Sequence, residues 1–142
     1  MTDERQVQEQ NDEKLINDAF QELLDRYLES KHRKKVEIIT KAFNFARQAH
    51  KGVRRRSGEP YILHPIAVAR IACVEIGLGS TSICSALLHD VVEDTDYTVE
   101  DIENLFGPKI AQIVDGLTKI SGGIFGDRAS AQAENFKKLL LT

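Results

Sequence analysis

The feature that most constrains this chain is an apolar run at residues 83–95, ICSALLHDVVEDT, which carries ionisable side chains in its interior. These side chains are His89, Asp90, Glu93 and Asp94. On a helix, each member of the His-Asp pair shares a face with the acidic residue four positions later. Carboxylates near an apolar core are unfavourable unless a cation neutralises them, and a divalent metal accepts mixed His and Asp ligands. The run therefore predicts a metal site on a helix.

The competing interpretation is an exposed helical face that carries surface charges. It does not explain why His89 and Asp90 lie directly between two aliphatic residues. A second histidine, His64 in YILHPIAVA, is far enough upstream to belong to a separate helix. A histidine before proline is, by itself, more often a cap or a core residue than a ligand. Its pairing with His89 and Asp90 makes it a third candidate ligand.

A basic segment, KGVRRRSGEP at residues 51–60, lies just before this histidine. It contains Arg55, Arg56 and Ser57. An arginine guanidinium pairs with phosphate oxygens or stacks on a purine, and a serine hydroxyl can reach a base edge. A solvated charged loop is the usual interpretation of such a run. Its position beside a candidate metal ligand favours a phosphorylated substrate.

The rest of the chain shows helical periodicity and no strand alternation, which predicts an all-α fold. Residues 1–12 form a polar tail that is expected to fray. The expected helices cover residues 12–30, 34–50, 62–77, 83–94, 98–106, 108–116 and 131–142, with a loop at 121–128.

Several residues are expected to define helix ends. Ser80 or Thr81 can cap the helix that carries the His-Asp pair. Thr98, with Asp101 three residues later, has the spacing of a capping box. His50 precedes the basic loop, and we expect it to have a structural role at a helix end, where a protonated imidazole is favourable.

The composition is that of an ordinary domain, with 142 residues, 42% of them hydrophobic, and a net charge of -3. This charge gives no general case for binding nucleic acid. No apolar run approaches the ~18 residues that cross a membrane, and the polar start lacks a signal-peptide segment. Cys73 and Cys84 lie outside any CxxC pair, which predicts reduced core thiols. We therefore expect a soluble cytoplasmic protein with neither a nucleic-acid nor a membrane partner.

Four motifs, RRSGEPYILHP, HPIAVA, LLHDVVEDT and FGPKIAQIVDGLTKI, together resemble the RelA/SpoT-homologue (Rel) family from about Lys35 to the end of the chain. The resemblance implies an all-α HD-domain helical bundle at the N-terminus of a longer, usually bifunctional enzyme of the bacterial stringent response. By this resemblance, the domain is expected to use Mn²⁺ to hydrolyse the 3′-pyrophosphate of (p)ppGpp to GDP or GTP and pyrophosphate. A separate downstream domain, of the GTP pyrophosphokinase type, makes (p)ppGpp.

The resemblance also implies a role for each candidate site residue. The metal ligands would be His64, His89 and Asp90, the residues that position or activate the attacking water would be Glu93 and Asp94, and the guanine nucleotide would be bound by Arg55, Arg56 and Ser57. Many relatives have lysine where this chain has Arg56, a change that keeps the charge. The intact HDxxED pattern argues against a decayed hydrolase site.

One departure from the family pattern bears on activity. The family's metal site uses a further aspartate from a downstream segment of the form ADRLHNMRT, and nothing of that form occurs before Thr142. The last residues, KKLLLT, lie in the middle of a helical pattern. We expect residues 13–142 to be the N-terminal part of the HD domain, with its downstream part and the synthetase domain absent. Such a fragment is expected to hold metal poorly or to be inactive.

Two other functions fit the same residues. The chain could be another HD-type phosphohydrolase that acts on a different nucleotide. It could instead be a regulatory module that senses (p)ppGpp and restrains a synthetase without turning the nucleotide over. The residue types do not identify the metal, because His and Asp also bind Zn²⁺, Fe²⁺ and Mg²⁺.

Overall fold

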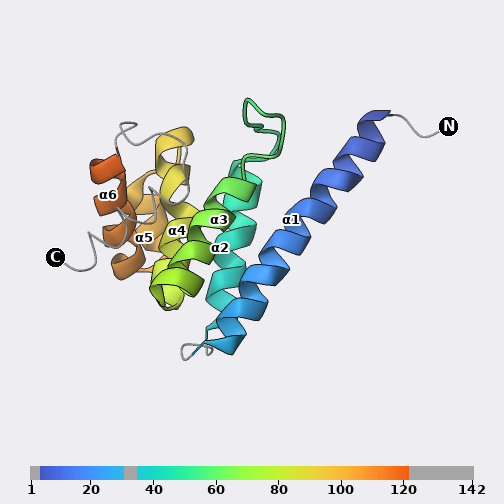
Figure 1. Cartoon of the computed structure of the whole chain (residues 1–142). Coiled ribbons are helices and arrows are strands. Elements are labelled where there is room, and N and C mark those ends of the chain that lie inside the picture. Colours follow the sequence, from blue (N-terminus) through green and yellow to red (C-terminus); the bar gives the residue numbers. More distant parts are fainter. Residues whose placement is uncertain (1–3, 31–34, 122–142) are drawn as a thin grey trace.

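The computed structural model describes residues 4–30 and 35–121, and in this part of the chain all regular structure is helical (Figure 1). The expected all-α fold is therefore confirmed. The elements are α1 (Glu4–Glu29), α2 (Val36–Ala49), α3 (Leu63–Ile71), the π-helical turn η1 (Ala72–Ile76), α4 (Ser80–Asp94), α5 (Val99–Phe106) and α6 (Pro108–Ser121). The loop and helix expected at 121–128 and 131–142 lie outside the described residues, apart from Ser121, which ends α6.

Helix α4 is the central element of the bundle. It packs against α2, α3 and α6, and Figure 1 shows it between the α2–α3 pair and the α5–α6 pair. Every side chain from Ser82 to Val91 is buried. A helix that is buried on all sides needs apolar residues on all its faces, which explains the continuous apolar run in its sequence. The His-Asp pair therefore lies inside the protein.

The neighbouring helices supply the rest of one apolar core. Phe20 of α1 stacks on Phe43 of α2 with ring centroids 3.9 Å apart. Leu23 and Tyr27 of α1 are fully buried, as is Ile39 of α2. Cys73 and Cys84 are buried and unbridged, as expected. No helix in the described ranges is long and apolar enough to cross a membrane.

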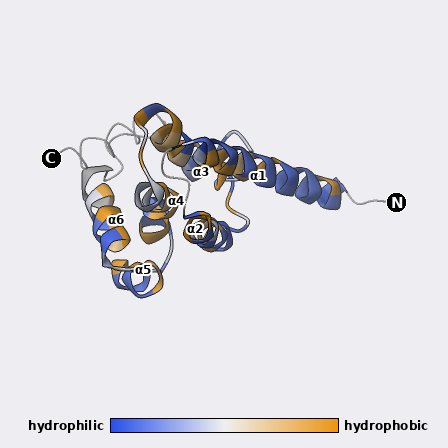
Figure 2. Ribbon diagram, turned by 90° about the horizontal axis from the view of Figure 1, so that it is seen from below, coloured by the Kyte–Doolittle hydropathy of each residue, from blue (hydrophilic) through white to orange (hydrophobic). Residues whose placement is uncertain are grey.

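The expected frayed tail is helical from Glu4, and this part of the prediction is wrong. Figure 2 shows the start of α1 projecting from the bundle, with mainly hydrophilic residues. Glutamate, glutamine and arginine are good helix formers, so a polar composition does not oppose helix. Two contacts add to this propensity: Asp12 pairs with Arg54 at 2.7 Å, and Glu13 pairs with Arg47 at 3.1 Å.

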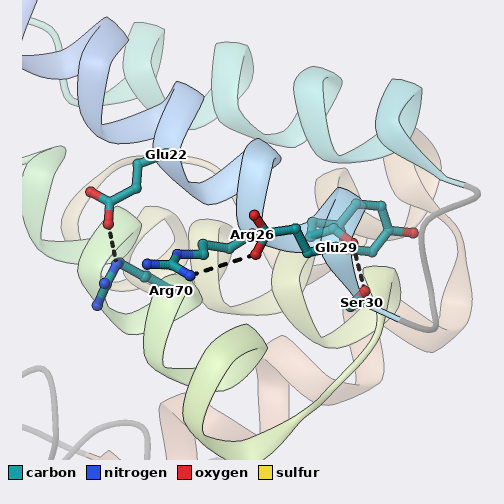
Figure 3. Close-up of polar contacts among 6 residues, drawn as sticks. Glu22, Arg26, Glu29, Ser30 and Arg70 are labelled. Atoms are coloured by element: carbon teal, nitrogen blue, oxygen red, sulfur yellow. Dashed lines mark hydrogen bonds and ion pairs between the residues drawn. The ribbon is translucent and has the colours of Figure 1, made fainter.

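Polar contacts also hold the second half of α1. Figure 3 shows Arg70 of α3 reaching Glu22 of α1, with Nε 2.9 Å from Oε1. Arg26 and Glu29 pair along α1 itself at 3.5 Å. Exposed pairs of this kind contribute about 0.2–1 kcal/mol each. Burial of the apolar stripe therefore contributes more than these ion pairs to fixing α1 on the bundle.

The capping box expected at Thr98 is confirmed. The Asp101 amide donates to the Thr98 hydroxyl at 3.2 Å, and the Thr98 amide donates to the Asp101 carboxylate at 2.9 Å. The helix before α4 ends at Gly77, whose φ of +79° is a conformation that glycine adopts without a side-chain penalty.

Two expected helix ends are wrong. The N-cap of α4 is Gly79, and neither Ser80 nor Thr81 occupies that position because the helix already begins at Ser80. Helix α6 continues past Gly116 to Ser121. A glycine in a helix costs only about 1 kcal/mol relative to alanine, and burial of the next residue, Leu117, offsets that cost.

The central position of α4 predicts a large effect of truncating its core residues. Leu87→Ala leaves a cavity at a fully buried position, and we expect the free energy of unfolding to fall by about 2–5 kcal/mol. Urea denaturation followed by circular dichroism measures this. The matched control is Leu105→Ala on α5, where the side chain is 40% exposed and the expected change is under about 0.5 kcal/mol. Equal losses in the two variants would contradict this packing.

Candidate metal centre

The structure brings the three expected metal ligands together. His64 lies in the first turn of α3, and His89 and Asp90 lie on the adjoining α4. All three are buried, with exposed fractions of 3%, 4% and 3%. Their potential ligand atoms all lie within 4.8 Å of one another. The alternative of a solvent-exposed charged face is therefore wrong for His89 and Asp90, and the three side chains could together hold a divalent metal.

The hydrogen bonds of His89 fit metal binding. Its Nδ1 lies 2.5 Å from the carbonyl oxygen of Ala86, a contact that requires a proton on Nδ1. Its Nε2 lies 3.0 Å from Oδ1 of Asp90. Either a second proton on the ring or a metal cation must then lie against Nε2 and the carboxylate. A carbonyl that holds the far nitrogen is the usual support of a metal-binding histidine.

Asp90 is held in the charged form that a metal ligand needs. Burial is the largest single influence on its pKa and raises it. Hydrogen bonds from His89 and Tyr61, together with the charges of His89 and His64, outweigh burial and lower the pKa to about 2. A ligand that is already ionised binds a cation without first losing a proton.

Glu93 and Asp94 lie at the C-terminal end of α4, one turn beyond the metal ligands, and both are exposed. Although Asp94 is exposed as a residue, the surrounding protein partly desolvates its carboxylate; this is the main cause that raises the pKa of Asp94, and the charge of Asp90 raises it further. The effect of Asp90 indicates that the two carboxylates face the same region, as their spacing on a helix predicts. A carboxylate with a raised pKa is a better proton acceptor.

The expected nucleotide-binding residues lie on the loop between α2 and α3. The loop is closed by an isolated bridge between Arg54 and Pro60, and the Tyr61 amide donates to the carbonyl of Val53 at 2.9 Å. Figure 1 shows it projecting from one end of the bundle. Its last residues lead directly into the first turn of α3, which carries His64. The base of the loop is therefore continuous with the metal cluster.

Within this loop, Glu59 contacts two of the three expected nucleotide-binding residues. The Arg55 guanidinium lies 3.8 Å from the Glu59 carboxylate, and the Ser57 hydroxyl donates a hydrogen bond to the same carboxylate. The Arg56 side chain is exposed. Arg54 of the basic run is paired with Asp12 of α1, so it anchors the loop.

Sequence reasoning missed the role of Tyr61 at this centre. Its hydroxyl donates to Oδ2 of Asp90 at 2.5 Å. The available signal was spacing, because Tyr61 precedes His64 by three positions and a helical turn brings such residues to the same side.

His50 is at the C-cap of α2, as expected, but its environment differs from the expectation. Its exposed fraction is 3%, and neither ring nitrogen has a hydrogen-bond partner among the described residues. Burial is the main influence on its pKa and lowers it, against the raising effects of Asp94 and Asp90. A protonated imidazole that stabilises the helix end is therefore disfavoured.

Comparison with known proteins identifies the family. A model of the HD domain matches residues 42–142. The chain is 44% identical over 124 residues to a guanosine-3′,5′-bis(diphosphate) 3′-pyrophosphohydrolase of Vibrio cholerae, and 43% identical over 124 residues to the bifunctional (p)ppGpp synthase/hydrolase SpoT of Escherichia coli. The chain belongs to the HD-domain family.

The HD-domain relatives are much longer than this chain. The two alignments cover 87% of the chain but 17% of either relative. A solved structure, described as a metazoan ortholog of SpoT that hydrolyses ppGpp, is 37% identical with a TM-score of 0.54. That match covers 56% of this chain and 47% of the other. The similarity to Rel-type proteins inferred from the motifs is thus confirmed.

The lowered pKa of Asp90 predicts how acid destabilises this HD domain. The folded-state pKa of about 2 lies below the ordinary value of 3.8, so the unfolded chain binds more protons between these values. The resulting stability is fully present above about pH 4 and is lost as the pH falls through 2. We expect Asp90→Asn to remove on the order of 2 kcal/mol of this acid dependence, measured by urea unfolding in metal-free buffer.

The control for this measurement is Asp96→Asn, which changes an exposed aspartate on the segment after α4. It is expected to keep the acid dependence of the unaltered chain. If the free energy of unfolding of Asp90→Asn depends on pH as steeply as that of the unaltered chain, Asp90 is not held ionised by its neighbours.

Proposed function

We propose that this chain is part of a metal-dependent hydrolase that removes the 3′-pyrophosphate of (p)ppGpp and leaves GDP or GTP. The observation that carries the proposal is the buried set of His64, His89 and Asp90, with ligand atoms within 4.8 Å of one another. Its occurrence in a chain 43–44% identical to (p)ppGpp hydrolases supports the choice of substrate.

The metal we propose is Mn²⁺, which would polarise the phosphate and lower the pKa of a bound water. His64, His89 and Asp90 would hold it with two nitrogens and one carboxylate. Glu93 and Asp94 orient the attacking water, and the raised pKa of Asp94 suits it to accept the proton. Water adds to the phosphorus attached to the 3′ oxygen, and the bond to that oxygen breaks to release pyrophosphate.

The basic loop is the proposed nucleotide-binding element. Arg55, Arg56 and Ser57 would contact the guanine and the 5′-phosphates, through charge-assisted hydrogen bonds and stacking. Glu59 contacts both Arg55 and Ser57 in the structure. Nucleotide binding would therefore exchange the Glu59 carboxylate for substrate oxygens at these two side chains, while Arg54 stays anchored on Asp12.

We further propose the organisation of the whole protein. Residues 13–142 would be the N-terminal part of the HD domain, followed in the parent chain by the rest of that domain and a (p)ppGpp synthetase domain. The name of the Escherichia coli relative, a bifunctional synthase/hydrolase, supports this arrangement. The parent would act in the cytoplasm on a soluble nucleotide.

The proposal is tested by pyrophosphate release from ppGpp in the presence of Mn²⁺. The assay uses this chain, and the same chain extended by a family segment that carries the further aspartate. We expect metal-dependent release by the extended protein, little or none by this chain alone, and loss of release when a chelator is added. Asp90→Ala should reduce it below detection, because the variant lacks a metal ligand. Asp96→Ala, at an exposed position, should keep full activity.

Two results would replace this proposal. Binding of ppGpp without turnover in either protein would favour a sensor module. Faster turnover of a nucleotide without a 3′-pyrophosphate would favour a different phosphohydrolase.

The exposed Arg56 should affect affinity for substrate. We expect Arg56→Ala to weaken ppGpp binding by about 10-fold or more, because a charge-assisted contact to phosphate is lost. Calorimetric titration measures this affinity. The matched control is Arg5→Ala at the projecting end of α1, which should bind ppGpp as the unaltered chain does. Equal affinities for all three proteins would remove Arg56 from the binding site.

A further inference from the structure

Tyr61 connects the basic loop to the metal cluster, and neither the sequence motifs nor the comparisons give it a role. It lies between the bridge that closes the loop and the first turn of α3. Its hydroxyl donates to Oδ2 of Asp90 at 2.5 Å. Its backbone is fixed on both sides, by hydrogen bonds to Val53 and from His64, each of 2.9 Å.

The two oxygens of Asp90 have different partners. Oδ1 lies 3.0 Å from Nε2 of His89. Oδ2 accepts the hydrogen bond of Tyr61. A cation held between His89 and Asp90 would therefore meet Oδ1, while Oδ2 is already hydrogen-bonded. A carboxylate held in this way would favour binding a metal through one oxygen, which would leave a coordination position for water.

The ring of Tyr61 contacts two imidazoles. Its centroid is 4.9 Å from that of His50 and 5.8 Å from that of His64. His50 is almost completely buried, so this contact is part of the packed interior. A hydroxyl on a ring that is held by its neighbours is preorganised to orient Asp90.

We propose that Tyr61 is a positioning residue, whose hydroxyl restricts Asp90 to one-oxygen ligation of the bound metal. The inference rests on the proposed metal-dependent function and specifies how this site keeps a position open for water. Without the hydroxyl, Oδ2 would be free to bind the metal beside Oδ1 as an additional ligand. The expected consequence is a change in coordination number as well as in affinity.

The test compares Tyr61→Phe with Tyr97→Phe in the chain loaded with Co²⁺, whose visible absorption becomes weaker as the coordination number rises. Tyr61→Phe keeps the ring contacts but removes a hydrogen bond to a charged group, so we expect it to stay folded with a lower unfolding midpoint. We expect it to bind Co²⁺ about 10–100-fold more weakly, with weaker visible absorption. Tyr97→Phe removes a hydroxyl from an exposed tyrosine and should change neither property.

The outcomes separate this inference from the proposed function. The same Co²⁺ affinity and spectrum in Tyr61→Phe and in the unaltered chain would overturn the role of Tyr61 and leave the hydrolase proposal intact. If Tyr61→Phe shows the expected change in Co²⁺ binding, but neither this chain nor the extended chain releases pyrophosphate from ppGpp, the role of Tyr61 is supported and the hydrolase proposal is overturned. A failure of both the unaltered chain and the extended chain to bind Co²⁺ would overturn both proposals.

Discussion

The structure depends on the burial of a histidine and an aspartate side by side in its central helix. His89 and Asp90 are surrounded by apolar residues of α4 and its neighbours, where uncompensated charge is strongly unfavourable. Compensation comes from the carbonyl of Ala86, the hydroxyl of Tyr61 and the nearby His64. These partners come from different elements, so the packing of α3 on α4 is also what builds the candidate metal centre.

Two aspartates four residues apart in this region have pKa values that are shifted in opposite directions. Asp90 is deeply buried, yet its hydrogen bonds and positive neighbours lower its pKa to about 2. Asp94 lies at the helix end, where partial burial and the charge of Asp90 raise its pKa. Carboxylates whose environments separate their pKa values commonly divide ligand and proton-acceptor roles between them. Our assignment of Asp90 to the metal and Asp94 to the water follows this division.

Helix α1 supports the basic loop through an ion pair that the polar composition of its first residues did not suggest. Asp12 pairs with Arg54, so one arginine of the basic run is committed to the fold. Arg55, which contacts Glu59, and the exposed Arg56 follow on the same anchored loop, whose base continues through Tyr61 into the metal cluster. The basic loop and the candidate metal centre are thus one structural unit, although we propose different parts of the reaction for their residues.

The sequence alone determined the all-α class, the capping box at Thr98 and the candidate ligands His64, His89 and Asp90, because local periodicity and burial cost act within short segments. It also carried the resemblance to Rel-type hydrolases. Only the tertiary structure decided that α1 is helical from Glu4, that Tyr61 holds Asp90 and that His50 is buried beside it. The contacts of Tyr61 and His50, and the ion pairs that support the start of α1, join elements far apart in the chain, so the pattern within one segment does not specify these partners.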